Sequence, residues 1–137
     1  EWNARITDQL GMGCIAELEK LGVKKTVVIT VPGAFEIPFA IKNYYRNAGK
    51  KNRADAFIAL GCVIKGDTPH FEYVCQAITN GVLQLNLLLP VPTIFGVLTV
   101  NTEEQAIERI GGKHGHKGEE AAITAMKMIT FSNSSKK

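Results

Sequence analysis

Residues 61–73, GCVIKGDTPHFEY, hold the groups best suited to chemistry in this sequence. An apolar run leads into a turn with Asp67 and Thr68. Thr68 and Pro69 fit the N-cap and first-turn positions of a helix that carries His70 one turn inside. A helix N-terminus offers unpaired backbone N–H groups to an anion, and a histidine can exchange a proton near neutral pH. This combination predicts a site that holds a phosphate and moves protons.

Four further residues are candidates for binding a ligand, although each also has a plain structural explanation. Glu36 follows a Pro-Gly turn at the start of a helix, where a carboxylate complements the helix dipole, and Arg109 suits the end of a helix for the same reason. The planar guanidinium of Arg109 gains a binding role if a phosphate lies near it. Trp2 precedes a possible cap, Asn3, so it is either a hydrophobic staple or a platform on which a flat ligand stacks. Phe95 lies in an apolar strand, where core packing is the default explanation.

Three other patterns are incomplete. The glycine-rich segment 111–118 lacks the Gly-Lys-Ser/Thr ending of a nucleotide-binding P-loop, so a flexible connector is the better interpretation. His114 and His116 within it lack a third metal ligand. Cys62 suggests a cysteine hydrolase, but its second neighbours on both sides are not the glycines that a nucleophile elbow requires. The sequence therefore favours neither a metal site nor a cysteine nucleophile.

The composition is typical of one globular domain spanning residues 1–137. Hydrophobic residues make up 45% and charged residues 21%, and no apolar run reaches the roughly 18 residues of a membrane span. A net charge of +3 with scattered lysines gives little support to nucleic-acid binding. Cys14, Cys62 and Cys75 lack the spacing of a disulfide framework, so we expect reduced, buried thiols. With no secretory signal visible before Trp2, we expect a cytoplasmic protein.

Hydrophobic spacing predicts helices that alternate with strands. Five helices are expected: Ile6 to Leu21, a segment after Pro32-Gly33 with Ile37, Ala40, Ile41 and Tyr44 on one side, residues 69–88, a helix from the capping box at Thr102 to Gly111-Gly112, and a last helix carrying Ala121 to Ile129. Three continuous apolar runs predict buried strands at 26–31, 56–64 and 93–100. We expect a surface loop at 47–53 and a fraying tail at SNSSKK.

This alternation predicts a three-layer α/β/α sandwich with a central parallel sheet. In such sheets, ligands bind beyond the carboxyl ends of the strands. The turns at 33–36, 65–70 and 100–102 all follow predicted strands. We therefore expect these three turns to gather at one edge.

Several long motifs together resemble the lumazine synthase family, which acts in riboflavin biosynthesis. They are VPGAFEIP at 31–38, GCVIKGDTPHFEY at 61–73, IFGVLTVNTEEQAIERIGGK at 94–113 and HKGEEAAITAM at 116–126. The resemblance implies a flavodoxin-like fold and a transferase that condenses 5-amino-6-(D-ribitylamino)uracil with 3,4-dihydroxy-2-butanone 4-phosphate. The products would be 6,7-dimethyl-8-ribityllumazine, phosphate and water, without a metal or organic cofactor. The alternative is a non-catalytic ligand-binding or shell-forming protein of the same fold.

The resemblance also implies a role for each candidate residue. His70 matches the family's proton-transfer histidine. The residues that would contact the pyrimidine and the ribityl chain are Trp2, Ala34, Phe35, Glu36, Cys62, Val63, Ile64 and Phe95. The residues that would contact the phosphate are Asp67, Thr68 and Arg109. Because Phe95 and Arg109 match residues that reach the site from a neighbouring subunit, the site would lie between subunits.

Assembly and the N-terminus follow from the same resemblance. Pentamers are the family's basic unit, and the short connector between the last two helices resembles members that close into a shell of sixty subunits. Small-molecule substrates and riboflavin synthase are the implied partners, with no nucleic acid and no membrane. The family begins with a strand that ends in an aromatic-Asn pair, whereas only Glu1 precedes Trp2 here. We therefore expect the first strand of the sheet to be missing from this sequence.

Overall fold

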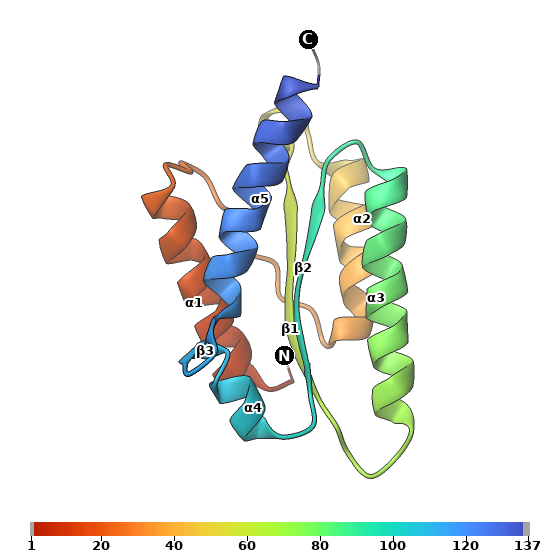
Figure 1. Cartoon of the computed structure of the whole chain (residues 1–137). Helices are drawn as coiled ribbons and strands as arrows, with labels where there is room; N and C mark the ends of the chain where they lie inside the picture. Colours follow the sequence, from red (N-terminus) through yellow and green to blue (C-terminus); the bar gives the residue numbers. More distant parts are fainter. Residues whose placement is uncertain (1, 136–137) are drawn as a thin grey trace.

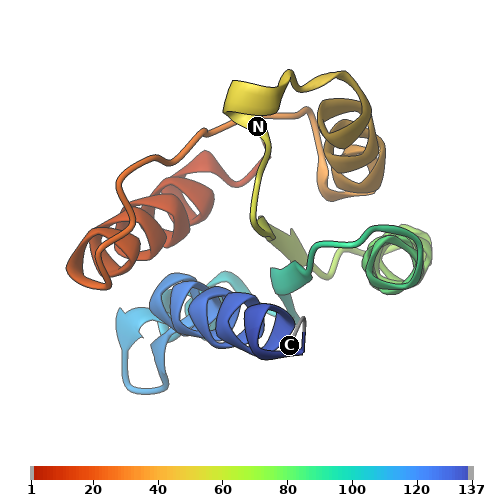
Figure 2. The same cartoon turned by 90° about the horizontal axis from the view of Figure 1, so that it is seen from above.

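The computed structural model describes residues 2–135 and has helices on both faces of a parallel pair of strands (Figure 1). The strands β1 (Phe57–Ile64) and β2 (Thr93–Val100) pair in parallel along their whole length. Helices α1 (Ala4–Lys20) and α5 (Lys117–Ser134) cover one face, and α2 (Ile37–Asn47) and α3 (His70–Leu88) cover the other (Figures 1 and 2). The predicted α/β architecture, with a parallel sheet between helix layers, is confirmed.

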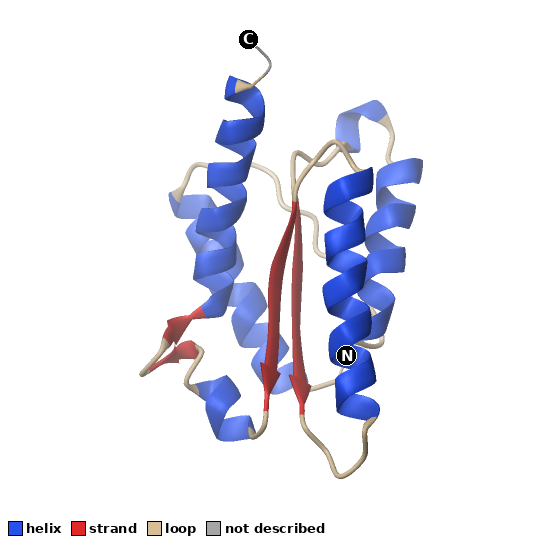
Figure 3. Cartoon of the chain, turned by 45° about the vertical axis from the view of Figure 1, so that its right-hand side comes forward, coloured by secondary structure: helices blue, strands red, loops and turns tan. Residues whose placement is uncertain are grey.

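Short elements join these layers. They are the 3-10 helices η1 (Ala34–Glu36) and η2 (Lys50–Asn52), the helix α4 (Glu103–Ile107), and the strands β3 (Ile110–Gly112) and β4 (Gly115–His116). The strands β3 and β4 form an antiparallel hairpin beside α4 and α5 (Figure 3). η2 lies inside the segment 47–53, where the sequence predicted only a surface loop.

The capping box at Thr102 is confirmed, but the helix that it starts is shorter than predicted. Thr102 Oγ1 accepts a hydrogen bond from Gln105 N at 3.4 Å, and Gln105 Oε1 accepts one from Asn101 N at 2.8 Å. The helix ends at Ile107, and the expected flexible connector is the β3–β4 hairpin. Gly111 and Gly115 have φ angles of 105° and 82°, which glycine adopts without strain, so the chain turns there instead of continuing as a helix.

The end of α5 also differs from the prediction. The helix continues to Ser134, so residues 132–134 of the expected fraying tail are helical. The hydroxyls of Ser134 and Ser135 donate to the carbonyl of Phe131 at 2.8 and 3.0 Å, which satisfies a backbone acceptor in the last turn. Residues 136–137 of that tail lie outside the described part of the chain.

The two strands divide the core into two halves, because neighbouring residues of a strand point to opposite faces. One half, between the strands and α2 and α3, contains Ile37, Ile41, Ala59, Ile78, Val82, Leu85 and Val97. The other half, towards α1, α4 and α5, contains Ile6, Leu10, Cys14, Leu18, Cys62, Ile94, Leu98, Ala106, Ala121, Ala122 and Ala125. The predicted helix faces therefore meet the sheet as expected.

The predicted strand at 26–31 is wrong: this segment between α1 and α2 has no assigned secondary structure (Figure 2). Its side chains Val27, Val28 and Ile29 are 53%, 69% and 52% exposed. A cavity of about 1250 Å³ lies between this segment and β1, lined by both. Paired strands lie about 4.8 Å apart. Because the cavity separates residues 27–29 from β1, they do not form the hydrogen bonds of a sheet with this strand. The expected further N-terminal strand stays a prediction.

Helices α1 and α5 approach each other closely where two glycines face the partner helix. A methyl group at Gly118 would lie 2.1 Å from the backbone oxygen of Leu10, and one at Gly13 would lie 2.2 Å from Cε1 of His116. His116 caps α5, because its Nδ1 accepts hydrogen bonds from Gly118 N at 3.1 Å and Glu119 N at 3.4 Å. The glycines thus leave room for the capping imidazole between the two helices.

Candidate active site

The carboxyl ends of β1 and β2 and the start of α1 meet at one edge of the fold. Lys65 N donates to Val100 O at 2.8 Å, which joins the two loops that follow the strands. The side chain of Asn3 donates to Cys62 O at 3.0 Å. A methyl group at Gly33 would lie 3.7 Å from the ring of Trp2, so the turn at 33–36 lies beside the same N-terminal segment. The predicted gathering of the three turns is confirmed.

Trp2 and Asn3 do not form the expected helix cap. Asn3 occupies the N-cap position with a φ of 58°, and its side chain bonds to Cys62 O instead of capping α1. Trp2 is 78% exposed, and the staple position one turn into the helix holds the polar Thr7. The staple explanation is therefore wrong, and the exposed indole remains available for stacking on a flat ligand.

His70 is the first residue of α3, not one turn inside it. The N-cap is Pro69, which has no capping side chain, so the prediction that Thr68 caps this helix is also wrong. Pro69 O accepts from Glu72 N at 3.1 Å and Tyr73 N at 3.4 Å. Within residues 2–135, the backbone N–H groups of His70 and Phe71 have no acceptor, as expected at the start of a helix. An exposed imidazole and two N–H donors therefore lie together, which suits an anion and a proton transfer.

Three of the remaining candidate residues line the large cavity, and the others lie next to them in the sequence. Trp2, Ala34 and Cys62 line it. Cys62 is buried, Val63 and Ile64 are half-buried, and Phe35 and Glu36 are exposed on η1. The cavity thus brings together Trp2, the turn before α2 and the end of β1, from three distant parts of the sequence.

Asp67 and Thr68 are exposed in the turn between β1 and α3. Lys65 and Glu72 form an ion pair of 3.8 Å across this turn, with both side chains about half exposed. Such an exposed pair contributes little to stability, about 0–1 kcal/mol. The turn is therefore held mainly by the strand and the helix on either side of it.

Arg109 lies in a different part of the same chain. It follows α4 and precedes β3, on the side of the sheet that carries α1 and α5, whereas α3 and its preceding turn lie on the other side (Figures 1 and 3). Its guanidinium donates two hydrogen bonds of 2.9 Å to the Glu120 carboxylate and another to the His114 carbonyl. Phe95 packs half-buried against the α2 and α3 core. A single chain therefore does not gather Arg109 with Asp67 and Thr68.

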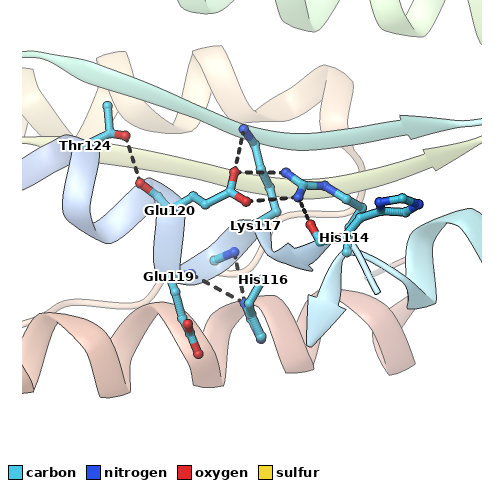
Figure 4. A network of polar contacts seen from close by, with 8 residues as sticks. His114, His116, Lys117, Glu119, Glu120 and Thr124 are labelled. Atoms are coloured by element: carbon cyan, nitrogen blue, oxygen red, sulfur yellow. Dashed lines mark hydrogen bonds and ion pairs between the residues drawn. The ribbon is translucent and has the colours of Figure 1, made fainter. Parts of the chain in front are cut away.

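Sequence reasoning missed Glu120, although the structure makes it the main partner of Arg109. The carboxylate also lies 3.6 Å from Lys117 Nζ, so two cations flank it (Figure 4). Hydrogen bonding from Arg109 lowers the pKa of Glu120, and the charge of Lys117 adds to this effect. The ion pair is therefore formed above the ordinary carboxyl pKa and is lost only as the pH falls through the lowered value. Arg109 lies between α4 and β3 whereas Glu120 lies in α5, so no periodicity within one helix or strand signals the pair.

Cys62 has the properties of a structural thiol. Burial, with a contribution from Glu103, raises its pKa to about 11. We expect iodoacetamide at pH 8 to modify Cys62 about a hundredfold more slowly than free cysteine, because only about one thiol in a thousand would be ionised. Peptide mass spectrometry over time would measure this rate, with the more exposed Cys75 as an internal control. A rate at Cys62 equal to that of free cysteine would make it a candidate nucleophile again.

Residues 2–135 contain no helix that is long and apolar enough to cross a membrane. Over the same residues, no three His, Cys, Asp or Glu side chains are grouped so that they could hold a metal ion.

Comparisons with known proteins agree on one family. A model of the family described as 6,7-dimethyl-8-ribityllumazine synthase matches residues 1–133. Three similar bacterial proteins carry that name. The protein of Parabacteroides distasonis is 49% identical over 134 residues, which cover 96% of this chain and 81% of that protein. The protein of Bacteroides fragilis is 51% identical over 133 residues, covering 96% and 90%. The protein of Porphyromonas gingivalis is 51% identical over 130 residues, covering 93% and 78%.

Proposed function

Because the chain belongs to the 6,7-dimethyl-8-ribityllumazine synthase family, we propose that it is the transferase that condenses 5-amino-6-(D-ribitylamino)uracil with 3,4-dihydroxy-2-butanone 4-phosphate. The products are 6,7-dimethyl-8-ribityllumazine, phosphate and water, and the reaction serves riboflavin biosynthesis. The observation that carries this proposal is the start of α3, where an exposed imidazole adjoins backbone N–H groups at the carboxyl edge of the sheet.

The proposed chemistry needs proton transfers beside a departing anion. An amine must add to a ketone, phosphate must leave, and a ring must close. His70 moves the protons, while Asp67, Thr68, the start of α3 and Arg109 hold the phosphate. Trp2 stacks on the pyrimidine, and Phe95 completes the pocket. The ribityl chain and the uracil edge are contacted by Ala34, Phe35, Glu36, Cys62, Val63 and Ile64. Holding both substrates together contributes the larger share of the rate acceleration, because it lowers the activation free energy by up to about 7–11 kcal/mol in favourable cases.

Mixing the protein with both substrates tests this function. We expect lumazine absorbance and fluorescence to grow together with one phosphate released for each product formed. Omitting either substrate is the control. Absence of product from folded protein would favour the alternative, a non-catalytic protein of the same fold, which no observation on this chain supports at present.

The site is proposed to form between two copies of the chain. Arg109 and the start of α3 lie on opposite sides of the sheet, so a neighbouring copy is the simplest source of the missing arginine. Phe95 lies near the amino end of β2, away from the carboxyl ends of the strands, so a neighbouring copy is proposed to supply this residue as well. The outer surfaces of α2 and α3 also expose large apolar side chains: Phe39, Tyr73, Leu83, Leu87 and Leu88. Such a surface is typical of a protein–protein interface. We expect a pentamer, and a closed shell of sixty subunits built from pentamers.

Replacing Arg109 with alanine should raise the KM for the phosphorylated substrate about 10- to 100-fold and change kcat much less. A hydrogen bond to a charged group contributes about 1.5–3 kcal/mol, and about 1.4 kcal/mol corresponds to a factor of ten. Steady-state kinetics with each substrate varied in turn would measure the effect. The matched control is Arg5→Ala, which removes another arginine that pairs with a carboxylate. The Arg5 side chain is 80% exposed, and its Nη1 lies 3.7 Å from Oε1 of Glu103. An unchanged KM in Arg109→Ala would exclude this arginine from phosphate binding.

We further propose a cytoplasmic location and riboflavin synthase as a partner that consumes the product. The three free cysteines support the location, since thiols persist in reducing compartments. Fractionation of cells that produce the protein, with riboflavin synthase activity measured in the same fractions, tests both statements.

A further inference from the structure

The guanidinium of Arg109 is bound along one edge and leaves another edge open. Its Nη1 and Nη2 atoms donate to Oε1 and Oε2 of Glu120, each at 2.9 Å, and Nη1 also donates to the His114 carbonyl. These bonds use three of the five N–H donors of an arginine side chain. Within residues 2–135, no acceptor contacts the other two, which are the Nε–H and the second N–H of Nη2.

The two remaining donors lie side by side. Nη2 is the terminal nitrogen on the same edge of the guanidinium as Nε–H, so the two N–H bonds are nearly parallel. A parallel pair of this kind matches two oxygens of one phosphate group. Arg109 also lines a cavity of about 470 Å³ together with Thr99, Gln105 and Lys117, so there is space for an anion beside it.

We propose that Glu120 is a positioning residue. It binds the Nη1–Nη2 edge of the Arg109 guanidinium and so orients the Nε–Nη2 edge towards the phosphate of the substrate. The inference rests on the proposed function, in which Arg109 binds that phosphate. An arginine side chain has many rotamers, and a partner that fixes one of them removes part of the entropy cost of binding. Lys117 and the carboxylate of Glu108 also line this cavity, so the open Nε–Nη2 edge of Arg109, and not a net positive charge, is what attracts the anion.

The test compares Glu120→Gln with Glu119→Gln. Glutamine keeps the shape of the side chain but replaces one acceptor oxygen by an NH₂ donor, so it cannot accept both bonds from Arg109. Glu119 is the matched control, because it carries the same charge in the same helical turn and its side chain has no described contact with Arg109. Glu120 is 46% exposed, so its replacement leaves the core unchanged, and circular dichroism would check the fold.

We expect Glu120→Gln to raise the KM for the phosphorylated substrate about fivefold, with kcat and the KM for the amine substrate unchanged. The dissociation constant of inorganic phosphate, measured by calorimetry on the assembled protein, should rise by the same factor, and Glu119→Gln should match the wild type. If Glu120 acts through Arg109, the double variant Arg109→Ala/Glu120→Gln should bind phosphate no more weakly than Arg109→Ala alone.

Two results would overturn the proposal: unchanged or tighter phosphate binding by Glu120→Gln, or a further loss in the double variant. The phosphate measurement does not depend on turnover. A wild-type protein that forms no lumazine would refute the proposed function, while the calorimetry would still decide whether Glu120 orients Arg109.

Discussion

Replacing His70 with alanine should lower kcat for lumazine formation about 10²-fold without abolishing it. General acid–base catalysis contributes about 10²–10⁴-fold, whereas the positioning of both substrates does not depend on the imidazole. His70 is exposed at the first position of α3, so the substitution removes no core contact. The loss should therefore appear in kcat and leave the free energy of unfolding nearly unchanged.

The measurement is steady-state product formation, with Asn80→Ala as the control. Asn80 is exposed on the same helix, more than two turns from the site, and its replacement should leave kcat unchanged. Added imidazole should restore part of the activity of His70→Ala, because the emptied position is open to solvent. Undiminished turnover of His70→Ala would remove this residue from the chemistry.

Replacing Gly118 with alanine should lower the free energy of unfolding by about 3 kcal/mol or more, at the upper end of overpacking effects. The new methyl group would lie 2.1 Å from the backbone oxygen of Leu10 and 3.0 Å from Cε1 of His116. Backbone atoms cannot move aside as a flexible side chain does, so α1 and α5 would have to separate along part of their contact. The free energy of unfolding of a whole domain is only about 5–15 kcal/mol, so this loss is a large fraction of the total stability.

Gly11→Ala is the matched control for this experiment. Gly11 lies inside α1, and a methyl group there would meet nothing within 4 Å. Alanine is favoured over glycine inside a helix by about 0.5–1 kcal/mol, so this variant should be more stable than the wild type. Urea unfolding followed by circular dichroism would compare both variants. Equal stability of Gly118→Ala and Gly11→Ala would show that the helices tolerate the added group.

Local patterns in the sequence predicted most of the helices and both strands of the parallel pair. The apolar spacing from Ile6 to Leu21 corresponds to α1, and the apolar runs 56–64 and 93–100 correspond to β1 and β2. Such patterns succeed because a helix face or a buried strand is encoded by residues only a few positions apart. The motifs that carry the family resemblance are likewise continuous segments.

The predicted strand at 26–31 failed for the opposite reason. Its β-branched residues have the composition of a strand, but a strand exists only where a neighbouring strand lies within hydrogen-bonding distance. Here a cavity separates the segment from β1. The start of α3 shows the same limit at one residue, because Pro69 rather than Thr68 became the N-cap.

The sequence by itself determined the candidate residues, the order of helices and strands, and the family. Only the tertiary structure decided which of these residues meet: Asn3 with Cys62, 59 positions apart, and Arg109 with Glu120, across the β3–β4 hairpin. The tertiary structure also decided that Arg109 and the start of α3 lie apart within a single chain. The physical reason is that periodicity reports only on nearby residues, whereas hydrogen bonds and ion pairs form between side chains that the folded chain brings together.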